Sequence, residues 1–316
     1  MKLKLLLTAT TIALAAGYAA TDTEFKFVFD RDFKFPDNVG KEDDETNQMI
    51  EKIKQKNIKF IKGLNPETVS IINCQGNNLK ATFVPSKTSS NKYVILSHGY
   101  RYNGLGEFGL ILPFYYEQNI NILAVDHQAA GESEGKYITF GYQESIDIIQ
   151  WAQYLIERFG QDIDIYLHGI SMGAATVCQC AGNENFQPQI KGIISDCPYA
   201  SAKKELMHTM EMFPKQLRGV TYNLLAKKLE SKCQAKLDEV NAIEAIKKCK
   251  VPFLAIHGME DTFVPTNGSI EIFDACPVED KHTLIVEKAA HAQSYWFAKD
   301  RYQQAILSII DPEDEV

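Results

Sequence analysis

The chain has 316 residues, of which 45% are hydrophobic and 23% are charged, a composition typical of a globular protein with room for one large domain. Its net charge of −8 leaves no basic field to hold a phosphate backbone, so we expect no nucleic-acid partner. The spacings of its seven cysteines match neither a zinc site nor a CxxC redox pair, and the sequence therefore predicts mostly buried thiols.

The N-terminus has the pattern of a secretory signal peptide. Lys2 and Lys4 precede residues 5–16, which are apolar apart from threonines, and small residues end at Ala19. We expect residues 1–19 to be removed and the protein to be secreted or to lie on the extracellular side of a membrane. The alternative is an uncleaved helix that anchors the chain in a membrane, although the apolar stretch is shorter than the roughly 20 residues that a span needs.

Residues 20–67 are expected to form an N-terminal extension packed on the main domain. Aromatic and polar residues alternate over residues 20–40, which suggests an extended segment, and residues 41–62 have the isoleucine spacing of an amphipathic helix. The next two segments, 68–73 and 79–84, flank a turn rich in Gly and Asn. They predict a hairpin at the antiparallel edge of the main sheet.

Apolar segments then alternate with amphipathic ones along the chain. The predicted strands are 93–97, 120–125, 163–168, 190–195, 251–256 and 283–286, and the clearest predicted helices are 143–159 and 293–310. This alternation predicts an α/β fold with a mostly parallel central sheet and helices on both faces, built from residues 68–199 and 249–316. Ligands of such sheets bind at the carboxyl ends of the strands.

Residues 200–248 interrupt this alternation and are predicted to be a helical cap inserted between two strands, above the site. Its apolar residues at spacings of one to four positions are Leu206, Met207, Met210, Phe213 and Leu217. If this face lines a pocket, it should bury apolar acyl or alcohol groups, each methylene contributing about 0.8 kcal/mol.

Ser171 lies in the pentapeptide 169–173, which reads G-x-S-x-G. A segment rich in β-branched and aromatic residues precedes it, and small apolar residues follow. This strand–turn–helix context is typical of a nucleophile elbow, in which a sharp turn lifts the serine oxygen clear of the sheet. Glycines on both sides leave room for that turn because they carry no Cβ.

A serine hydroxyl needs a base, and the base needs an orienting carboxylate. His291 follows the last predicted strand and Asp261 follows the strand before it, so the chain order is Ser171, Asp261, His291. Asp196 also follows a strand and is the rival carboxylate. We favour Asp261 because its longer loop can reach back to His291.

Two backbone N–H groups are expected to stabilise an oxyanion, those of Met172 and of Tyr100, which follows the His-Gly pair at 98–99. The histidines that end other predicted strands, His98, His168 and His257, are expected to support turns rather than to take part in the chemistry.

These segments together resemble the α/β-hydrolase superfamily of serine hydrolases, and most closely its bacterial members with a helical cap. The elbow and the His291 loop are the specific motifs, and the segments at 98–100, 126–135 and 257–265 support them. The resemblance implies an acyl-enzyme mechanism that needs no metal and no cofactor. One departure is Asp-His-Gln-Ala-Ala-Gly at 126–131, where many relatives carry Asp-x-Arg-Gly-His-Gly.

The predicted function is the hydrolysis of small carboxylic esters through an acyl-enzyme. A peptidase acting on small peptides is the alternative, since the same three residues serve both reactions. A binding protein on a hydrolase scaffold is less expected, because such proteins usually lose one of the three residues.

Overall fold

The computed structural model of the protein describes residues 22–33, 45–211 and 214–311. The predicted signal peptide and its cleavage site at Ala19 lie outside the described residues, and so does Phe213. Within the described ranges, we find no helix that is both long and apolar enough to cross a bilayer.

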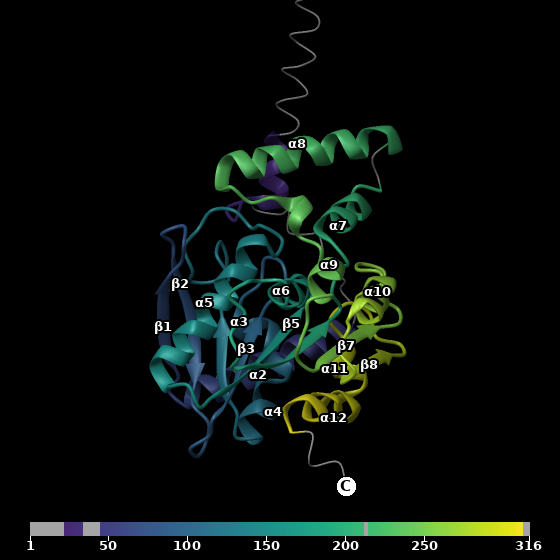
Figure 1. The fold of residues 1–316 in the computed structure, drawn as a ribbon. Helices are drawn as coiled ribbons and strands as arrows, with labels where there is room; N and C mark the ends of the chain where they lie inside the picture. Colours follow the sequence, from purple (N-terminus) through teal and green to yellow (C-terminus); the bar gives the residue numbers. More distant parts are fainter. Residues whose placement is uncertain (1–21, 34–44, 212–213, 312–316) are drawn as a thin grey trace, which may run out of the picture.

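A twisted sheet forms the centre of the molecule (Figure 1). In the described part of the chain it has eight strands, in the order β1-β2-β4-β3-β5-β6-β7-β8. The strands are β1 (Glu67–Ile72), β2 (Asn78–Val84), β3 (Lys92–Ser97), β4 (Asn121–Val125), β5 (Asp164–Ile170), β6 (Ile190–Asp196), β7 (Phe253–Gly258) and β8 (Lys281–Val286). β2 is antiparallel to both of its neighbours, and all the other pairs are parallel. The predicted mostly parallel sheet with an antiparallel edge hairpin is confirmed.

Helices cover both faces of this sheet. One face packs against α5 (Tyr142–Phe159), α6 (Met172–Cys180), α9 (Ala242–Ile246) and α10 (Asn267–Ala275), and the other against α2 (Glu45–Gly63), α4 (Leu112–Glu117) and α12 (Lys299–Ile310). Short helices α3 (Gly104–Glu107) and α11 (Ser294–Phe297) lie in loops.

Successive side chains of β3 show why the strands read as continuous apolar runs. Tyr93 and Ile95 are buried in one core, and Val94 and Leu96 in the other. Because neighbouring residues of a strand point to opposite faces, a strand with a core on each side must be apolar at every position.

The cap contains α7 (Ala202–Thr209) and α8 (Lys215–Cys233), which stand over the carboxyl ends of the strands (Figure 1). A β-bridge between Ser201 and Asn241 ties the two ends of this part of the chain together. The hydrophobic cluster inside the cap includes one residue from each of three loops that follow different strands: Met172, Tyr199 and Val264. The cap is therefore packed directly on the loops that carry the candidate site.

The N-terminal segment differs from its prediction. Residues 22–29 form a helix beneath α8 rather than an extended segment (Figure 1). Phe25 and Phe29 are one helical turn apart, and both are buried against Leu225 and Leu229 of α8. Their spacing fits a strand or a helix, and packing under the cap selected the helix.

The predicted apolar residues of the cap do not all lie on one surface. Leu206 and Met210 belong to α7 or its end and are buried in the packed interior of the cap, whereas Leu217 belongs to α8 and is exposed. Leu206 and Met210 therefore share one buried face, and Leu217 lies outside it.

Candidate active site

Ser171 occupies a strained turn between β5 and α6, with φ 58° and ψ −120°. A Cβ on Gly169 would lie 2.1 Å from the carbonyl oxygen of Gly173, and a Cβ on Gly173 would lie 1.8 Å from that of Ser97. Both distances are sterically impossible, so only glycine fits at these two positions. The backbone N–H of Ser171 donates to the carbonyl of Asp196 (2.8 Å), which fixes the turn against β6.

A chain of hydrogen bonds joins three side chains that are far apart in the sequence. His291 Nε2 lies 2.8 Å from Ser171 Oγ, and His291 Nδ1 lies 2.7 Å from Asp261 Oδ2. Each residue follows a different strand (β5, β7 and β8), and these strands end at the same edge of the sheet. The structure therefore brings together the three residues that the sequence singled out.

The electrostatics of His291 suit an imidazole that gains a proton during a reaction. Burial alone would lower its pKa, but the hydrogen bond to Asp261 and the charge on that carboxylate outweigh burial. The net effect raises the pKa of His291 above its ordinary value of 6.5. The imidazolium is thus stabilised where it would form.

Asp261 accepts hydrogen bonds on both carboxylate oxygens. The backbone N–H groups of Phe263 and Val264 donate to Oδ1 (2.9 and 2.8 Å), and His257 and His291 donate to Oδ2. Burial raises the pKa of Asp261, but the hydrogen bonds from the two histidines outweigh it and hold the pKa well below its usual range. Asp261 therefore stays ionised and cannot rotate freely.

His257 is a residue whose part in the site sequence reasoning missed, because it was expected only to support a turn. Its Nε2 lies 3.1 Å from Asp261 Oδ2 and 3.0 Å from the carbonyl oxygen of Val264. Both partners are acceptors, so Nε2 carries the hydrogen, and the buried Nδ1 has no hydrogen-bond partner among the described residues. The signal in the sequence was its position at the end of a strand, four residues before Asp261.

The rival carboxylate Asp196 points elsewhere. It accepts hydrogen bonds from Ser294 Oγ (3.2 Å) and Tyr302 Oη (2.9 Å), and burial raises its pKa to about 6. In the parts of the chain that the structure describes, it makes no hydrogen bond to His291. Asp196 instead ties α11 and α12 to the end of β6, behind the His291 loop.

The two predicted oxyanion donors lie beside Ser171. Neither the N–H of Tyr100 nor that of Met172 has a hydrogen-bond acceptor within the described residues. Met172 is the first residue of α6, and the backbone N–H groups in the first turn of a helix have no acceptor within the helix. A Cβ on Gly99 would lie 3.3 Å from the Cβ of Ser171, so the turn that carries Tyr100 passes directly over the serine.

Hydrogen bonds from the side chains of His98 and Glu107 hold the turn at residues 98–100 in place. His98 Nδ1 donates to the carbonyl of Gly99 (2.7 Å), and its Nε2 accepts the backbone N–H of His127 (3.0 Å). The N–H of Gly99 donates to Glu107 Oε2 (3.1 Å). His98 is thus a turn-supporting residue, as the sequence predicted.

The N-terminal segment 22–33 also holds this turn, which the sequence did not indicate. The Tyr100 hydroxyl donates to the carbonyl of Val28 (2.7 Å), and the guanidinium of Arg101 donates to the carbonyls of Phe27 (3.0 Å) and Asp30 (2.7 Å). The segment therefore links the cap to the turn beside Ser171.

A buried carboxyl of the cap lies within electrostatic range of the site. Glu205 of α7 lines a cavity of about 150 Å³ together with Tyr199, His208 and Val264. Burial raises its pKa to about 7, while the charges of His208 and His291 lower it and that of Asp261 raises it. No sequence pattern marked this residue, because its proximity to His291 depends on how the cap folds over.

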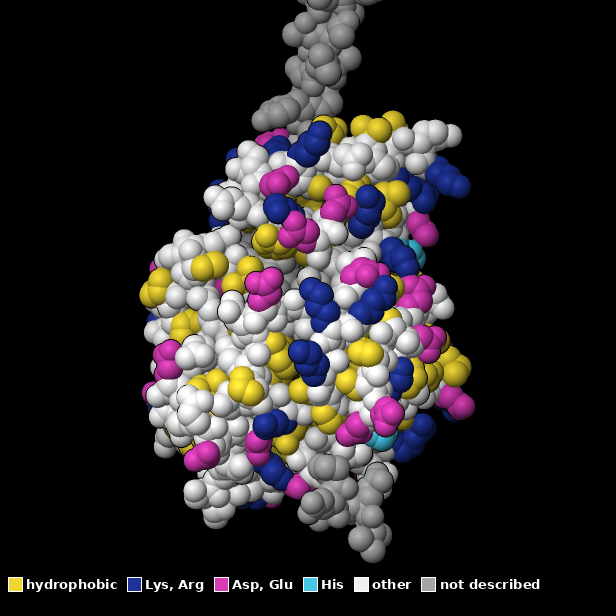
Figure 2. Space-filling view, in the orientation of Figure 1, with side chains coloured by type: hydrophobic (Ala, Val, Ile, Leu, Met, Phe, Trp, Pro, Cys, Tyr) yellow, Lys and Arg dark blue, Asp and Glu magenta, His cyan; other side chains and the backbone are white. Residues whose placement is uncertain are grey.

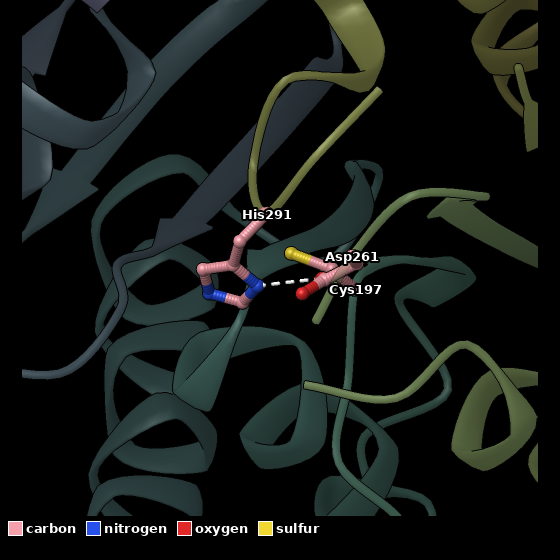
Figure 3. A group of neighbouring side chains, drawn as sticks. All are labelled: Cys197, Asp261 and His291. Carbon is pink, nitrogen blue, oxygen red and sulfur yellow. Dashed lines mark hydrogen bonds and ion pairs between the residues drawn. The ribbon is translucent and has the colours of Figure 1, made fainter. Parts of the chain in front are cut away.

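Cys197 packs beside the hydrogen-bonded pair of Asp261 and His291 (Figure 3). The ligand atoms of these three residues lie within 4.8 Å of one another, which is the spacing of a potential soft-metal site. Metal binding would need a thiolate, but burial raises the pKa of the Cys197 thiol well above its ordinary value. The thiol fits better as a packing neighbour. All seven cysteines are free thiols, and five of them are buried.

A sequence model of the prolyl oligopeptidase family matches residues 135–310. The chain is 26% identical over 241 residues to the uncharacterized protein YqkD of Bacillus subtilis, covering 75% of this chain and 76% of that protein. It is also 26% identical over 238 residues to the mouse alpha/beta hydrolase domain-containing protein 17C, covering 73% of this chain and 64% of that protein.

Solved structures share the fold at lower identity. An esterase of Pyrococcus furiosus superposes with a TM-score of 0.63 at 22% identity, over 79% of this chain and 94% of the esterase. Est1E of Butyrivibrio proteoclasticus, solved with ferulic acid bound, superposes with a TM-score of 0.59 at 19% identity, over 77% of this chain and 99% of Est1E. Because the family model covers more than half of the chain, this protein belongs to the prolyl oligopeptidase family of α/β-hydrolases.

Proposed function

We propose that the protein is a serine hydrolase that cleaves small carboxylic esters through an acyl-enzyme. The observation that carries the proposal is the unbroken hydrogen-bond chain from Ser171 Oγ through His291 to Asp261. The strained backbone of Ser171, with two N–H groups beside it that lack acceptors within the described residues, supports the same reading.

The first half of the reaction forms the acyl-enzyme. His291 Nε2 takes the proton of Ser171 as Oγ attacks the ester carbonyl carbon. The negative charge that develops on the carbonyl oxygen is stabilised by the N–H groups of Tyr100 and Met172, and by the N-terminal end of α6. His291 then passes its proton to the departing alkoxide, and the acyl group stays on Ser171.

In the second half of the reaction, water takes the place of Ser171 as the nucleophile. A water molecule gives its proton to His291 Nε2 and attacks the acyl carbon, and His291 returns the proton to Ser171 Oγ as the acid leaves. Asp261 keeps the proton of the neutral imidazole on Nδ1 and stabilises the imidazolium in both halves. His257 holds Asp261 in the required orientation.

An ester substrate is favoured because an alcohol leaves more readily than an amine. A small-peptide substrate is the second candidate, and one observation favours it. The family matched by the chain is named for a peptidase.

A fluorophosphonate probe tests the central claim, since it labels only activated serines. Wild-type protein should be labelled and Ser171→Ala should not, while a circular dichroism spectrum shows that the variant is folded. A screen of p-nitrophenyl esters beside aminoacyl-p-nitroanilides then separates the two substrate classes. Faster turnover of the anilides would replace the esterase proposal by the peptidase.

We further propose that the protein is exported and that residues 1–19 are removed, on the strength of the N-terminal pattern alone. N-terminal sequencing of protein from the culture medium should begin near Ala20. Recovery of the intact N-terminus in the membrane fraction only would favour an anchor.

A further inference from the structure

The outer side of the cap carries an exposed apolar ridge. Leu217, Val220 and Leu224 of α8 are 53, 57 and 49% exposed. Their spacing of three and four residues places them in one line along the helix. The opposite side of α8 packs into the cap through Tyr222, Leu225 and Leu229. A helix that is apolar on two sides normally has a partner on both, so this outer ridge is a candidate docking surface.

Among the helices that the structure describes, the one that carries the ridge has the highest net positive charge. α8 carries five Lys or Arg residues and one Glu, although the chain as a whole has a net charge of −8. The exposed Lys227 lies three residues after Leu224, on the same side of the helix. Figure 2 shows hydrophobic side chains along the edge of the molecule formed by α8, with Lys and Arg side chains beside them. A helix with apolar and basic residues together is typical of attachment to an anionic lipid surface.

The chain enters the fold beside this helix. Asp22, the first described residue, forms an ion pair with Lys228 of α8, and the Lys228 ammonium lies 5.2 Å from the centre of the Phe25 ring. The described chain therefore begins next to α8, four residues along that helix from Leu224. In the sequence, the apolar residues 5–16 come shortly before this point.

We propose that the outer ridge of α8 docks on a lipid bilayer that contains anionic headgroups, so that the cap faces the membrane. A second copy of the chain is a poorer occupant, because three aliphatic side chains on one helix fall well short of the roughly 1,200 Å² that a specific protein interface buries. One such ridge gives weak, reversible attachment, and stable attachment needs a second signal such as an apolar N-terminus. The proposal stands independently of the substrate.

Fluorescence quenching tests whether α8 itself touches lipid, whatever else holds the chain. An indole introduced by Leu224→Trp is compared with one introduced by Phe60→Trp, an exposed position in α2 that contacts Tyr116 of α4, the helix that precedes the amino end of β4. The native residues Trp151 and Trp296 give the same background in both. Vesicles of phosphatidylserine and brominated phosphatidylcholine should quench the indole at position 224 by roughly half and leave the one at position 60 unchanged.

Vesicle partitioning tests whether the ridge contributes to binding. The triple variant Leu217→Ser/Val220→Ser/Leu224→Ser removes the ridge, and Met49→Ser/Phe60→Ser/Ile270→Ser removes three similarly exposed apolar side chains elsewhere. For the full chain, we expect the ridge variant to partition at least about 10-fold less into anionic vesicles than the control variant, and salt to weaken the binding of the wild type. Hydrolysis of a soluble ester should be equal in both variants.

Three results would overturn the proposal. An unquenched indole at position 224 in vesicle-bound protein would mean that another part of the chain makes the contact. Equal partitioning of the two triple variants would show that the ridge adds nothing. A wild-type dimer in light scattering that the ridge variant fails to form would identify a second copy as the occupant.

Discussion

Nε2 of His257 lies 3.1 Å from Oδ2 of Asp261, the same oxygen that accepts a hydrogen bond from Nδ1 of His291 (2.7 Å). One carboxylate oxygen therefore serves two imidazoles, one of which faces Ser171 and one of which is fully buried. The buried ring of His257 donates from Nε2, because both neighbours of that nitrogen are acceptors. Its Nδ1 has no hydrogen-bond partner in the described residues. This relationship makes His257 a positioning residue for the proposed reaction.

We predict that His257→Leu lowers kcat by roughly 10- to 100-fold with little change in KM, because Asp261 loses one of the donors that orient it. His257→Gln, which can keep an N–H donor, should retain more activity. The exposed His282 provides the control, and His282→Leu should behave as wild type. Steady-state kinetics of the three purified variants decide this, and an unchanged kcat in His257→Leu would remove His257 from the site.

Asp261→Asn should lower kcat by about 10⁴-fold, because an amide at this position favours the wrong tautomer of His291. Asp196→Asn should cost far less in kcat, since that side chain contacts Ser294 and Tyr302 and not His291. Its effect should appear mainly as a lower melting temperature. The reverse ranking in kcat would make Asp196 the orienting acid.

The pH profile of kcat/KM should report His291. Only the neutral imidazole can accept the serine proton, so activity should rise with pH and level off above the pKa of His291. That pKa is raised above 6.5 by the hydrogen bond and charge of Asp261, which outweigh burial. The midpoint should therefore lie above pH 6.5 in the wild type and move to lower pH in the residual activity of Asp261→Asn. A wild-type midpoint below 6.5 contradicts the prediction.

Glu205 should make the folded state less stable as pH rises. Burial raises its pKa from 4.5 to about 7, so the folded protein holds this proton more tightly than the unfolded chain does. The resulting stabilisation is complete below pH 4.5 and is lost as pH rises through about 7.

Glu205→Gln should accordingly be more stable than the wild type at pH 8.5, by up to about 3 kcal/mol, and differ little from it at pH 5. Thermal melts at both pH values measure the difference. Glu230→Gln, an exposed change on α8, should alter neither melt. A Glu205→Gln variant that is destabilised equally at both pH values would show that the carboxyl has a hydrogen-bonding role instead.

The sequence by itself determined the sheet and the chain order of the proposed catalytic residues. Strands buried on both faces must be apolar throughout, and the glycines at 169 and 173 are the only residues that fit the turn around Ser171. Both requirements act on residues that are close together in the chain, so they can be recognised in the sequence. Because parallel strands end at one edge, a histidine and a carboxylate that follow strands were predicted to lie near Ser171.

The tertiary structure alone decided what surrounds these residues. Phe25 and Phe29 form part of a helix because α8 offers an apolar surface to cover, and Glu205 lies near His291 because α7 folds over the strand ends. The choice between Asp261 and Asp196 rested on which carboxylate points at His291, a matter of side-chain direction that strand order does not fix. Each depends on contacts between segments that are distant in sequence, and no local periodicity encodes such contacts.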